Sequence, residues 1–171
     1  MSTLNNEIYA ALIEFIEKNQ NSIYRLAYSY VKSQDTALDM VQESIYKAIK
    51  AHNKIEDISS VKPWFYKILV NTCMDELRRS RRIIATAPEE LPEEMEDCLS
   101  DKADYMVLHN ALESLDTETK TVIVLRYFED MKLTEIAKVL EENLNSVKSR
   151  LYRGLRSLKV QMKEGELSNV E

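Results

Sequence analysis

Apolar side chains recur every three to four residues along most of the chain, the spacing that gathers them on one side of an α-helix. In the first half, such patterns run over residues 8–16, 23–31, 38–49 and 63–82. The third pattern counts Leu38, Val41 and Ile45 among its apolar positions. In the second half, the same spacing runs over residues 105–115, 119–128, 133–140 and 144–162. The chain is therefore predicted to be all-α, with two groups of helices.

An acidic stretch separates the two groups of helices. Between residues 83 and 104 the helical spacing is lost, two prolines occur, and most of the charged side chains are acidic. Segments with few apolar residues and a high net charge do not bury enough surface to fold by themselves. We expect two small helical domains, at residues 1–85 and 105–171, joined by a flexible acidic linker at residues 86–104.

The overall charge does not exclude a nucleic-acid partner. The formal net charge is -6, but residues 88–104 alone hold eight acidic side chains and one basic side chain. The two flanking parts are each close to neutral, and attraction to phosphate depends on where basic groups cluster. Only two glycines and three prolines occur in 171 residues, which again favours long helices.

The segment from Leu133 to Arg153 has the pattern of a helix-turn-helix. Ile136 and Leu140 would be buried in the first helix, and the small side chain of Ala137 would let the second helix approach. The second helix would present a polar and basic face, with Lys148 and Arg150 at the edges of that face. The face consists of Asn145, Ser146, Lys148, Ser149, Arg150, Tyr152, Arg153 and Arg156. An α-helix fits the major groove, where arginine pairs with guanine and Asn or Ser contacts base edges. This face is predicted to be a recognition helix.

The turn between these two helices has an unusual composition. Glu141 and Glu142 stand where a glycine and an apolar residue are more common. Asn143 follows them, and asparagine is among the preferred N-cap residues. A basic helix face is in general more often only solvated, but the two-helix pattern favours DNA binding here.

A second candidate surface lies on the helix predicted to begin near Pro63, a residue tolerated in the first turn. Trp64, Lys67, Asn71, Arg78 and Arg82 fall within about 60° of helical arc. Such a stripe can hold phosphates and stack on unpaired bases, a contact worth roughly 1–3 kcal/mol per base. The alternative is ordinary packing of the tryptophan beside a solvated basic face. The same helix carries a cluster of four arginines, Arg78, Arg79, Arg81 and Arg82. Clustered guanidiniums repel one another unless an anion is near, so the cluster favours binding of nucleic-acid phosphates over the alternative.

Three segments, in this order along the chain, resemble the sigma-70 family, in particular its small two-domain extracytoplasmic-function (ECF) group. The segment from Asp35 to Glu43 resembles the region that binds polymerase. Residues 63–79 resemble the helix that binds and opens the minus-ten element, and residues 51–62 resemble the loop that captures a flipped base. Residues 146–153 resemble the minus-thirty-five recognition helix, although Asn145 and Ser146 replace the Gly and Thr common at its start.

The resemblance implies partners and site residues. Polymerase binding, to the coiled coil of the beta-prime subunit, would use Asp35, Asp39, Gln42 and Glu43; the beta flap of core RNA polymerase is a further expected contact. Minus-ten recognition would use Trp64, Lys67, Asn71, Arg78, Arg79 and Arg82. The resemblance also implies promoter DNA and an anti-sigma factor, often membrane-anchored, as partners. In the family the linker threads through polymerase channels, so its carboxylates here would either mimic RNA phosphates or belong to a plain tether.

Two other classes of function compete with the one that the resemblance implies. A stand-alone helix-turn-helix regulator with a sensing or dimerisation domain explains the second half equally well, but not the acidic face and the aromatic-basic helix of the first. An enzyme is disfavoured, because only His52 and His109 are available and no Gly-rich phosphate loop, catalytic triad or metal-ligand spacing occurs. We expect no catalytic residue, cofactor, metal or small-molecule substrate.

Cys73 and Cys98 lie far apart, which argues against a disulfide framework or a zinc site. No apolar run approaches the roughly 20 residues of a membrane span, so a cytoplasmic protein is predicted.

Overall fold

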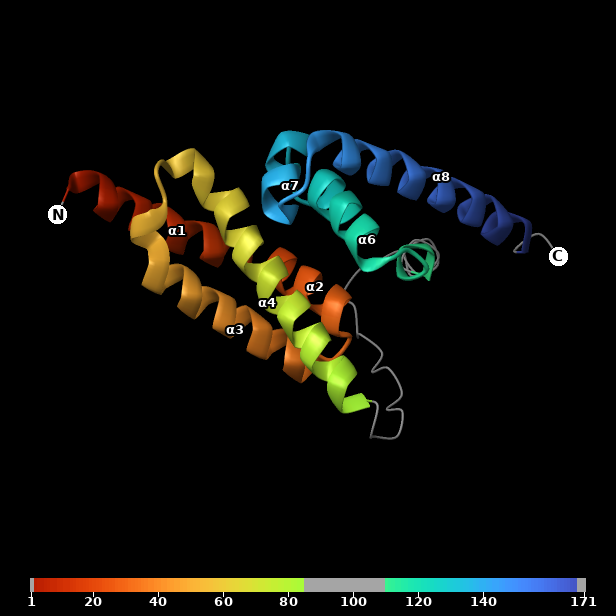
Figure 1. The fold of residues 1–171 in the computed structure, drawn as a ribbon, viewed down its shortest axis with the longest axis horizontal. Coiled ribbons are helices and arrows are strands. Elements are labelled where there is room, and N and C mark those ends of the chain that lie inside the picture. The colour runs from red at the N-terminus through yellow and green to blue at the C-terminus, as the bar shows by residue number, and fades with distance from the viewer. Residues whose placement is uncertain (1, 85–109, 169–171) are drawn as a thin grey trace. The chain divides into compact units, whose positions relative to one another are not determined.

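The computed structural model describes residues 2–84 and 110–168, and every regular element in these ranges is helical. The chain forms two compact units, as the all-α, two-domain prediction requires (Figure 1). The predicted linker at residues 86–104 lies outside the described residues, as do Cys98 and His109. None of the helices in the described ranges is long and apolar enough to cross a membrane.

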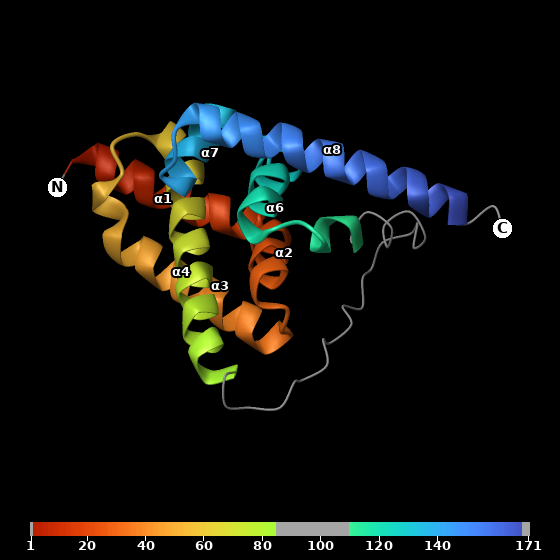
Figure 2. The same cartoon turned by 45° about the vertical axis from the view of Figure 1, so that its right-hand side comes forward.

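The first unit is a bundle of four long helices. They are α1 (Thr3–Lys18), α2 (Gln20–Val31), α3 (Gln34–Ala51) and α4 (Val61–Ile84). The fourth helix packs against the other three (Figure 1, Figure 2). Phe65 and Tyr66 of α4 are wholly buried, and both rings meet Phe15 of α1 edge-on, at centroid distances of 5.7 and 5.8 Å. This aromatic cluster fixes the start of α4, the helix that carries the candidate stripe.

Local hydrogen bonds explain where the helices of this unit begin and end. Lys32 adopts a left-handed conformation, with a φ of 55°, and ends α2. The side chain of Ser33 then accepts a hydrogen bond from the Thr36 amide and starts α3. The predicted loop over residues 51–62 consists mainly of two 3-10 turns, η1 (His52–Lys54) and η2 (Ile58–Ser60). Asp57 caps the second turn by accepting from the Ser60 amide at 3.1 Å.

Leu38, an apolar position of the third pattern, does not lie on the buried side of α3. Half of this side chain is exposed, whereas the buried side of α3 is formed by Ala37, Met40, Ser44 and Ala48. Three of these four residues are small, so α3 can lie close to α2 and α4. Leu38 stands about 100° around the helix from Ala37 and therefore points away from the bundle.

The second half of the described chain holds shorter helices before a long one. Helical residues 110–113 precede α6 (Thr117–Ile123), which continues into a π-helical turn, η3 (Val124–Phe128). Then come α7 (Leu133–Leu140) and α8 (Leu144–Ser168). The predicted helix-turn-helix is thus present, with its expected apolar residues Ile136, Val147 and Leu151 buried.

Helix α8 lies close to α6 at Gly154, a residue that the sequence pattern did not single out. A Cβ atom at this position would lie 2.6 Å from Thr119 Cγ2 and 2.7 Å from Ile123 Cδ1. Both neighbours are buried in α6, at 1% and 3% exposure. The absence of a side chain at residue 154 therefore sets the spacing of these two helices.

Candidate nucleic-acid interface

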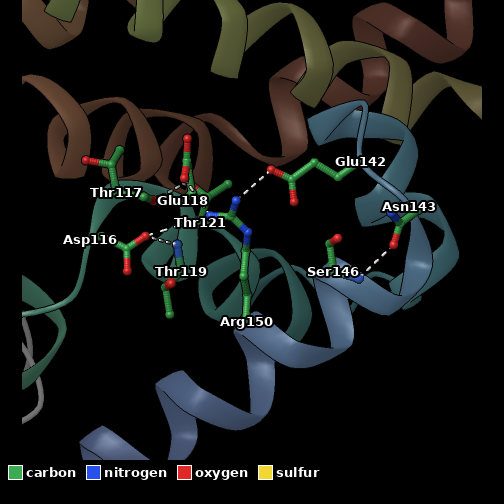
Figure 3. Close-up of polar contacts among 9 residues, drawn as sticks. All are labelled: Asp116, Thr117, Glu118, Thr119, Thr121, Glu142, Asn143, Ser146 and Arg150. Carbon is green, nitrogen blue, oxygen red and sulfur yellow. Dashed lines mark hydrogen bonds and ion pairs between the residues drawn. The ribbon is translucent and has the colours of Figure 1, made fainter.

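The turn of the helix-turn-helix is closed by backbone hydrogen bonds in spite of its two glutamates. Glu141 adopts the left-handed conformation, with a φ of 56°, and the Glu142 amide donates to the carbonyl of Ala137 at 3.0 Å. This is the bond of a Schellman helix ending, in which glycine is the usual left-handed residue. The Asn143 side chain then accepts from the Ser146 amide at 2.8 Å, which confirms Asn143 as the cap of α8 (Figure 3).

The outward side of α8 carries most of the predicted recognition residues. Val147 and Leu151 hold its opposite side in the core. The exposed members are Asn145, Lys148, Ser149, Tyr152, Arg153 and Arg156, while Ser146 is partly covered. Tyr152 is 60% exposed, a high value for an aromatic side chain. One helix face thus offers amide, hydroxyl, aromatic and guanidinium groups in the combination that contacts base edges and phosphates.

Arg150 differs from the other predicted recognition residues. Its side chain is only 20% exposed and lies among three carboxylates (Figure 3). The Nη1 atom is 2.5 Å from Glu118 and 3.8 Å from Asp116, and the Nη2 atom is 2.9 Å from Glu142. The hydrogen bond to Glu118 is the main cause that raises the pKa of Arg150 above its ordinary value. The guanidinium is therefore engaged within the protein.

Asp116 makes two kinds of interaction in this cluster, a helix cap and an ion pair. Its carboxylate caps α6 by accepting from the Thr119 amide at 3.1 Å, and it faces Arg150. Partial burial opposes ionisation of Asp116, but the hydrogen bonds from Thr119 and the charge of Arg150 outweigh it and lower the pKa of this carboxyl. The start of α6 and the second turn of α8 are thereby linked through one charge network.

The aromatic-basic stripe lies on one continuous helix, α4. Asn71, Arg78 and Arg82 are exposed there, whereas Trp64 and Lys67 are partly covered. The helix is uninterrupted from Val61 to Ile84, so all five residues share one side as the spacing predicts.

Two of the four clustered arginines of α4 have carboxylate partners on their own helix. Arg78 pairs with Asp75 at 3.1 Å, and Arg79 makes two hydrogen bonds to Glu76, at 2.9 and 3.0 Å. The hydrogen bonds to Glu76 raise the pKa of Arg79. Repulsion among the guanidiniums therefore does not by itself require an external anion at Arg78 or Arg79. Both side chains remain about two-thirds exposed and open to a further anion.

The predicted polymerase-binding residues share an exposed face of α3. Its predicted members are Asp35, Asp39, Gln42 and Glu43. Two hydrophobic side chains that the sequence argument missed lie on this side as well, Leu38 at 50% exposure and Tyr46 at 65%. The signal was present in the sequence, because residues 35, 38, 39, 42 and 46 follow one another at helical spacing. An apolar and acidic surface of this kind suits a protein partner better than nucleic acid.

The two halves of the chain match two different regions of one known protein family. Residues 15–83 match the family Sigma-70 region 2, and residues 105–158 match Sigma-70, region 4. The chain is 44% identical over 159 residues to the RNA polymerase sigma factor SigV of Bacillus subtilis, covering 93% of this chain and 95% of that protein. It is 29% identical to the RNA polymerase sigma-E factor of Streptomyces coelicolor, over 87% of this chain and 84% of that protein.

Two solved structures share the fold. The sigma factor RpoE of Bartonella quintana, in complex with the anti-sigma factor NepR, has a TM-score of 0.72 at 22% identity, covering 88% of this chain and 97% of that one. CnrH, in complex with the cytosolic domain of CnrY, has a TM-score of 0.67 at 20% identity, covering 94% and 96%. The likeness extends over both units.

Proposed function

This chain belongs to the sigma-70 family, within its extracytoplasmic-function group, and from that membership we propose how its two units divide the task of promoter recognition. The chain is a transcription initiation factor that directs RNA polymerase to promoters, and it is not an enzyme. A stand-alone regulator is not favoured, because both halves of the chain match sigma-70 regions.

In this proposal α8 reads the minus-thirty-five element as intact duplex. The supporting observation is the exposed polar face opposite Val147 and Leu151, which includes Arg153. An arginine that projects from a major-groove helix can donate two hydrogen bonds to guanine, and Lys148 and Arg156 are placed to contact phosphates. Each bidentate pair is worth roughly 1–3 kcal/mol of discrimination between bases.

The first unit is proposed to act on the opened minus-ten element. Its stripe on α4 combines a partly exposed tryptophan with exposed basic groups, and it follows the turns η1 and η2 along the chain. Aromatic stacking on an unpaired base, together with phosphate contacts by Arg78 and Arg82, stabilises an open strand in preference to a closed duplex.

The exposed face of α3 is the proposed contact with core polymerase. Asp39, Gln42 and Glu43 supply the polar part, and Leu38 and Tyr46 add apolar surface beside them. Interfaces gain most of their affinity from a few apolar or aromatic anchors, so Tyr46 is expected to contribute more than the surrounding carboxylates.

Regulation by an anti-sigma factor, in response to envelope stress, is a further part of the proposal. The likeness to RpoE, whose structure contains the anti-sigma factor NepR, supports the regulation by an anti-sigma factor. The envelope-stress signal is inferred from membership of the extracytoplasmic-function group. We propose that the chain acts in the cytoplasm, where core polymerase and chromosomal promoters are found.

The match of both halves to sigma-70 regions, each with most of its candidate side chains exposed, carries this proposal. The test is run-off transcription with core RNA polymerase on a panel of promoters. Wild type is expected to direct specific initiation, and Arg153→Ala is expected to reduce it about tenfold or more while binding of core polymerase is kept. Arg25→Ala, which removes an exposed positive charge on α2, is the matched control. If the chain neither binds core polymerase nor changes the start sites of transcripts, the proposal is wrong.

A further inference from the structure

Arg150 lies in the second turn of the proposed recognition helix, but its side chain turns toward α6 (Figure 3). We propose that Arg150 is a positioning residue, which holds α8 at its reading angle and makes no base contact itself. This inference rests on the proposed function of α8. It changes the expectation from the sequence, which placed Arg150 with the DNA-binding residues.

The three carboxylates around Arg150 come from three places in the fold. Asp116 caps α6, Glu118 lies in the first turn of α6, and Glu142 lies in the turn between α7 and α8. Both terminal nitrogens of the guanidinium are used, Nη1 toward α6 and Nη2 toward the turn. One side chain therefore ties the recognition helix both to the helix behind it and to the turn before it.

The same hydrogen bonds and the burial of the side chain disfavour direct reading of a base by Arg150. An arginine that recognises guanine presents two N–H groups outward to the O6 and N7 atoms of the base. Arg150 already donates from both terminal nitrogens to carboxylates, and four-fifths of its side chain is covered. Two of its five N–H groups are thus used, and the low exposure of the side chain leaves the others little access to a base, whereas Arg153 is exposed.

Breaking these contacts would also leave the carboxylates poorly compensated. Glu142 Oε2 is buried and has no hydrogen-bond partner, so Oε1 and its bond to Arg150 carry the compensation for that side chain. Without Arg150, three negative charges would remain at the base of a helix that has to approach DNA phosphates. Repulsion between carboxylates and phosphates would then weaken binding to every sequence alike.

A second contact along α8 supports the positioning role. Gly154 lies one turn beyond Arg150 and packs against Thr119 and Ile123 of α6. Arg150 meets the first turn of α6, whereas Gly154 lies against both the third residue and the last residue of that helix. Two separate contacts on the same pair of helices fix both the rotation and the tilt of α8, which decide what Arg153 and Asn145 can reach.

The inference is tested with holoenzyme on a set of promoters that carry each single substitution in the minus-thirty-five element. We expect Arg150→Ala to lower initiation by a common factor, about tenfold, while the order of preference among the promoters stays as in wild type. Arg153→Ala, as the comparison, is expected to change the preference at one base pair. If Arg150→Ala instead removes the preference at a single base pair, Arg150 reads DNA and the inference is wrong.

Rescue variants separate positioning from direct contact. Because Glu142→Gln removes the charge that Arg150 compensates, Arg150→Ala with Glu142→Gln should initiate several-fold better than Arg150→Ala alone. Arg150→Lys keeps one donor group and should lie between wild type and Arg150→Ala. A double variant no better than Arg150→Ala would contradict the inference.

A measurement without DNA keeps this test independent of the proposed function. The coupling between Arg150 and Glu142 is obtained from urea unfolding of the full chain with the two single variants and the double variant. A clear coupling supports the tie between α8 and the turn, and additive effects would overturn it. If wild type shows no promoter-specific initiation at all, the proposed function fails, and the unfolding cycle still decides the role of Arg150.

Discussion

Replacing Gly154 by alanine tests whether the spacing of α6 and α8 is as close as the structure has it. The added methyl group would lie 2.6 Å from Thr119 Cγ2 and 2.7 Å from Ile123 Cδ1. These distances are well below an ordinary carbon contact of about 3.5–4.0 Å, so at least one neighbour has to move. Thr119 is β-branched and 1% exposed, which leaves it little room.

Two opposing effects decide the result of Gly154→Ala. Alanine gains about 1 kcal/mol over glycine inside a helix. Overpacking a filled core costs about 1–3 kcal/mol. The close contacts to two buried side chains place this site toward the upper part of that range, so we expect a net loss of about 1 kcal/mol in the free energy of unfolding.

The assay is urea unfolding of the full chain followed by far-UV circular dichroism, with tryptophan fluorescence as an internal control. Trp64 is the single tryptophan and lies in the first unit, so its fluorescence transition should stay unchanged. The exposed Lys159, on the same helix, provides the matched reference, because the difference between Lys159→Ala and Lys159→Gly measures helix propensity alone. If Gly154→Ala raised stability by as much as that reference difference, the helices would have room for a methyl group and the reasoning would be refuted.

Two further predictions concern the turn and the buried thiol. Because Glu141 is held at a φ of 56°, a conformation that glycine adopts without strain, Glu141→Gly should raise the free energy of unfolding by about 1 kcal/mol. Glu141→Ala should give no such gain. Equal effects of the two substitutions in urea unfolding would contradict this prediction. Burial, aided by the charges of Glu43 and Glu76, raises the pKa of Cys73 from 9.0 to about 12, so alkylation by iodoacetamide at about pH 8 should be far slower in the native chain than in urea, as followed by peptide mass spectrometry. Since the folded pKa lies above the unfolded one, the contribution of Cys73 to stability is complete below about pH 9 and is lost as the pH rises toward 12. A native rate equal to the denatured rate would show that the thiol is accessible.

Helical periodicity predicted most of the helices in the described residues. The patterns over residues 8–16 and 23–31 lie within α1 and α2, and the last two patterns of the chain correspond to α7 and α8. Asn143 was identified as a cap from residue type alone, since few side chains accept a hydrogen bond in that position. Periodicity and capping depend on residues within one or two turns, which a single sequence contains in full.

Contacts between distant segments explain what the sequence did not predict. Leu38 belongs to an apolar stripe of α3, but α2 and α4 pack against the neighbouring stripe, which consists mostly of small residues. This packing depends on helices that are distant in sequence. Arg150 stands at the edge of the polar face on a helical wheel, and its strongest partner, Glu118, is 32 residues away. The tight fit at Gly154 likewise depends on α6.

The arginines of α4 have carboxylate neighbours that a count of positive charges leaves out. Counting four guanidiniums suggested that an anion from outside is required, but Asp75 and Glu76 lie three residues before Arg78 and Arg79 on the same helix. Pairs at this spacing are neighbours on a helix surface and partly neutralise each other. The prediction of a phosphate-binding stripe is thus supported by the exposed groups and by Trp64, and less by repulsion.

The division of labour between the two units is tested most directly by initiation on a template whose minus-ten region is already unpaired. Holoenzymes with Trp64→Ala and with Arg153→Ala are compared on the fully paired promoter and on this pre-opened one. We expect the Trp64→Ala defect to be largely relieved by the open template, because strand opening is no longer required, whereas the Arg153→Ala defect should persist. Equal relief of both variants, or of neither, would contradict the assignment of strand opening to α4 and duplex reading to α8.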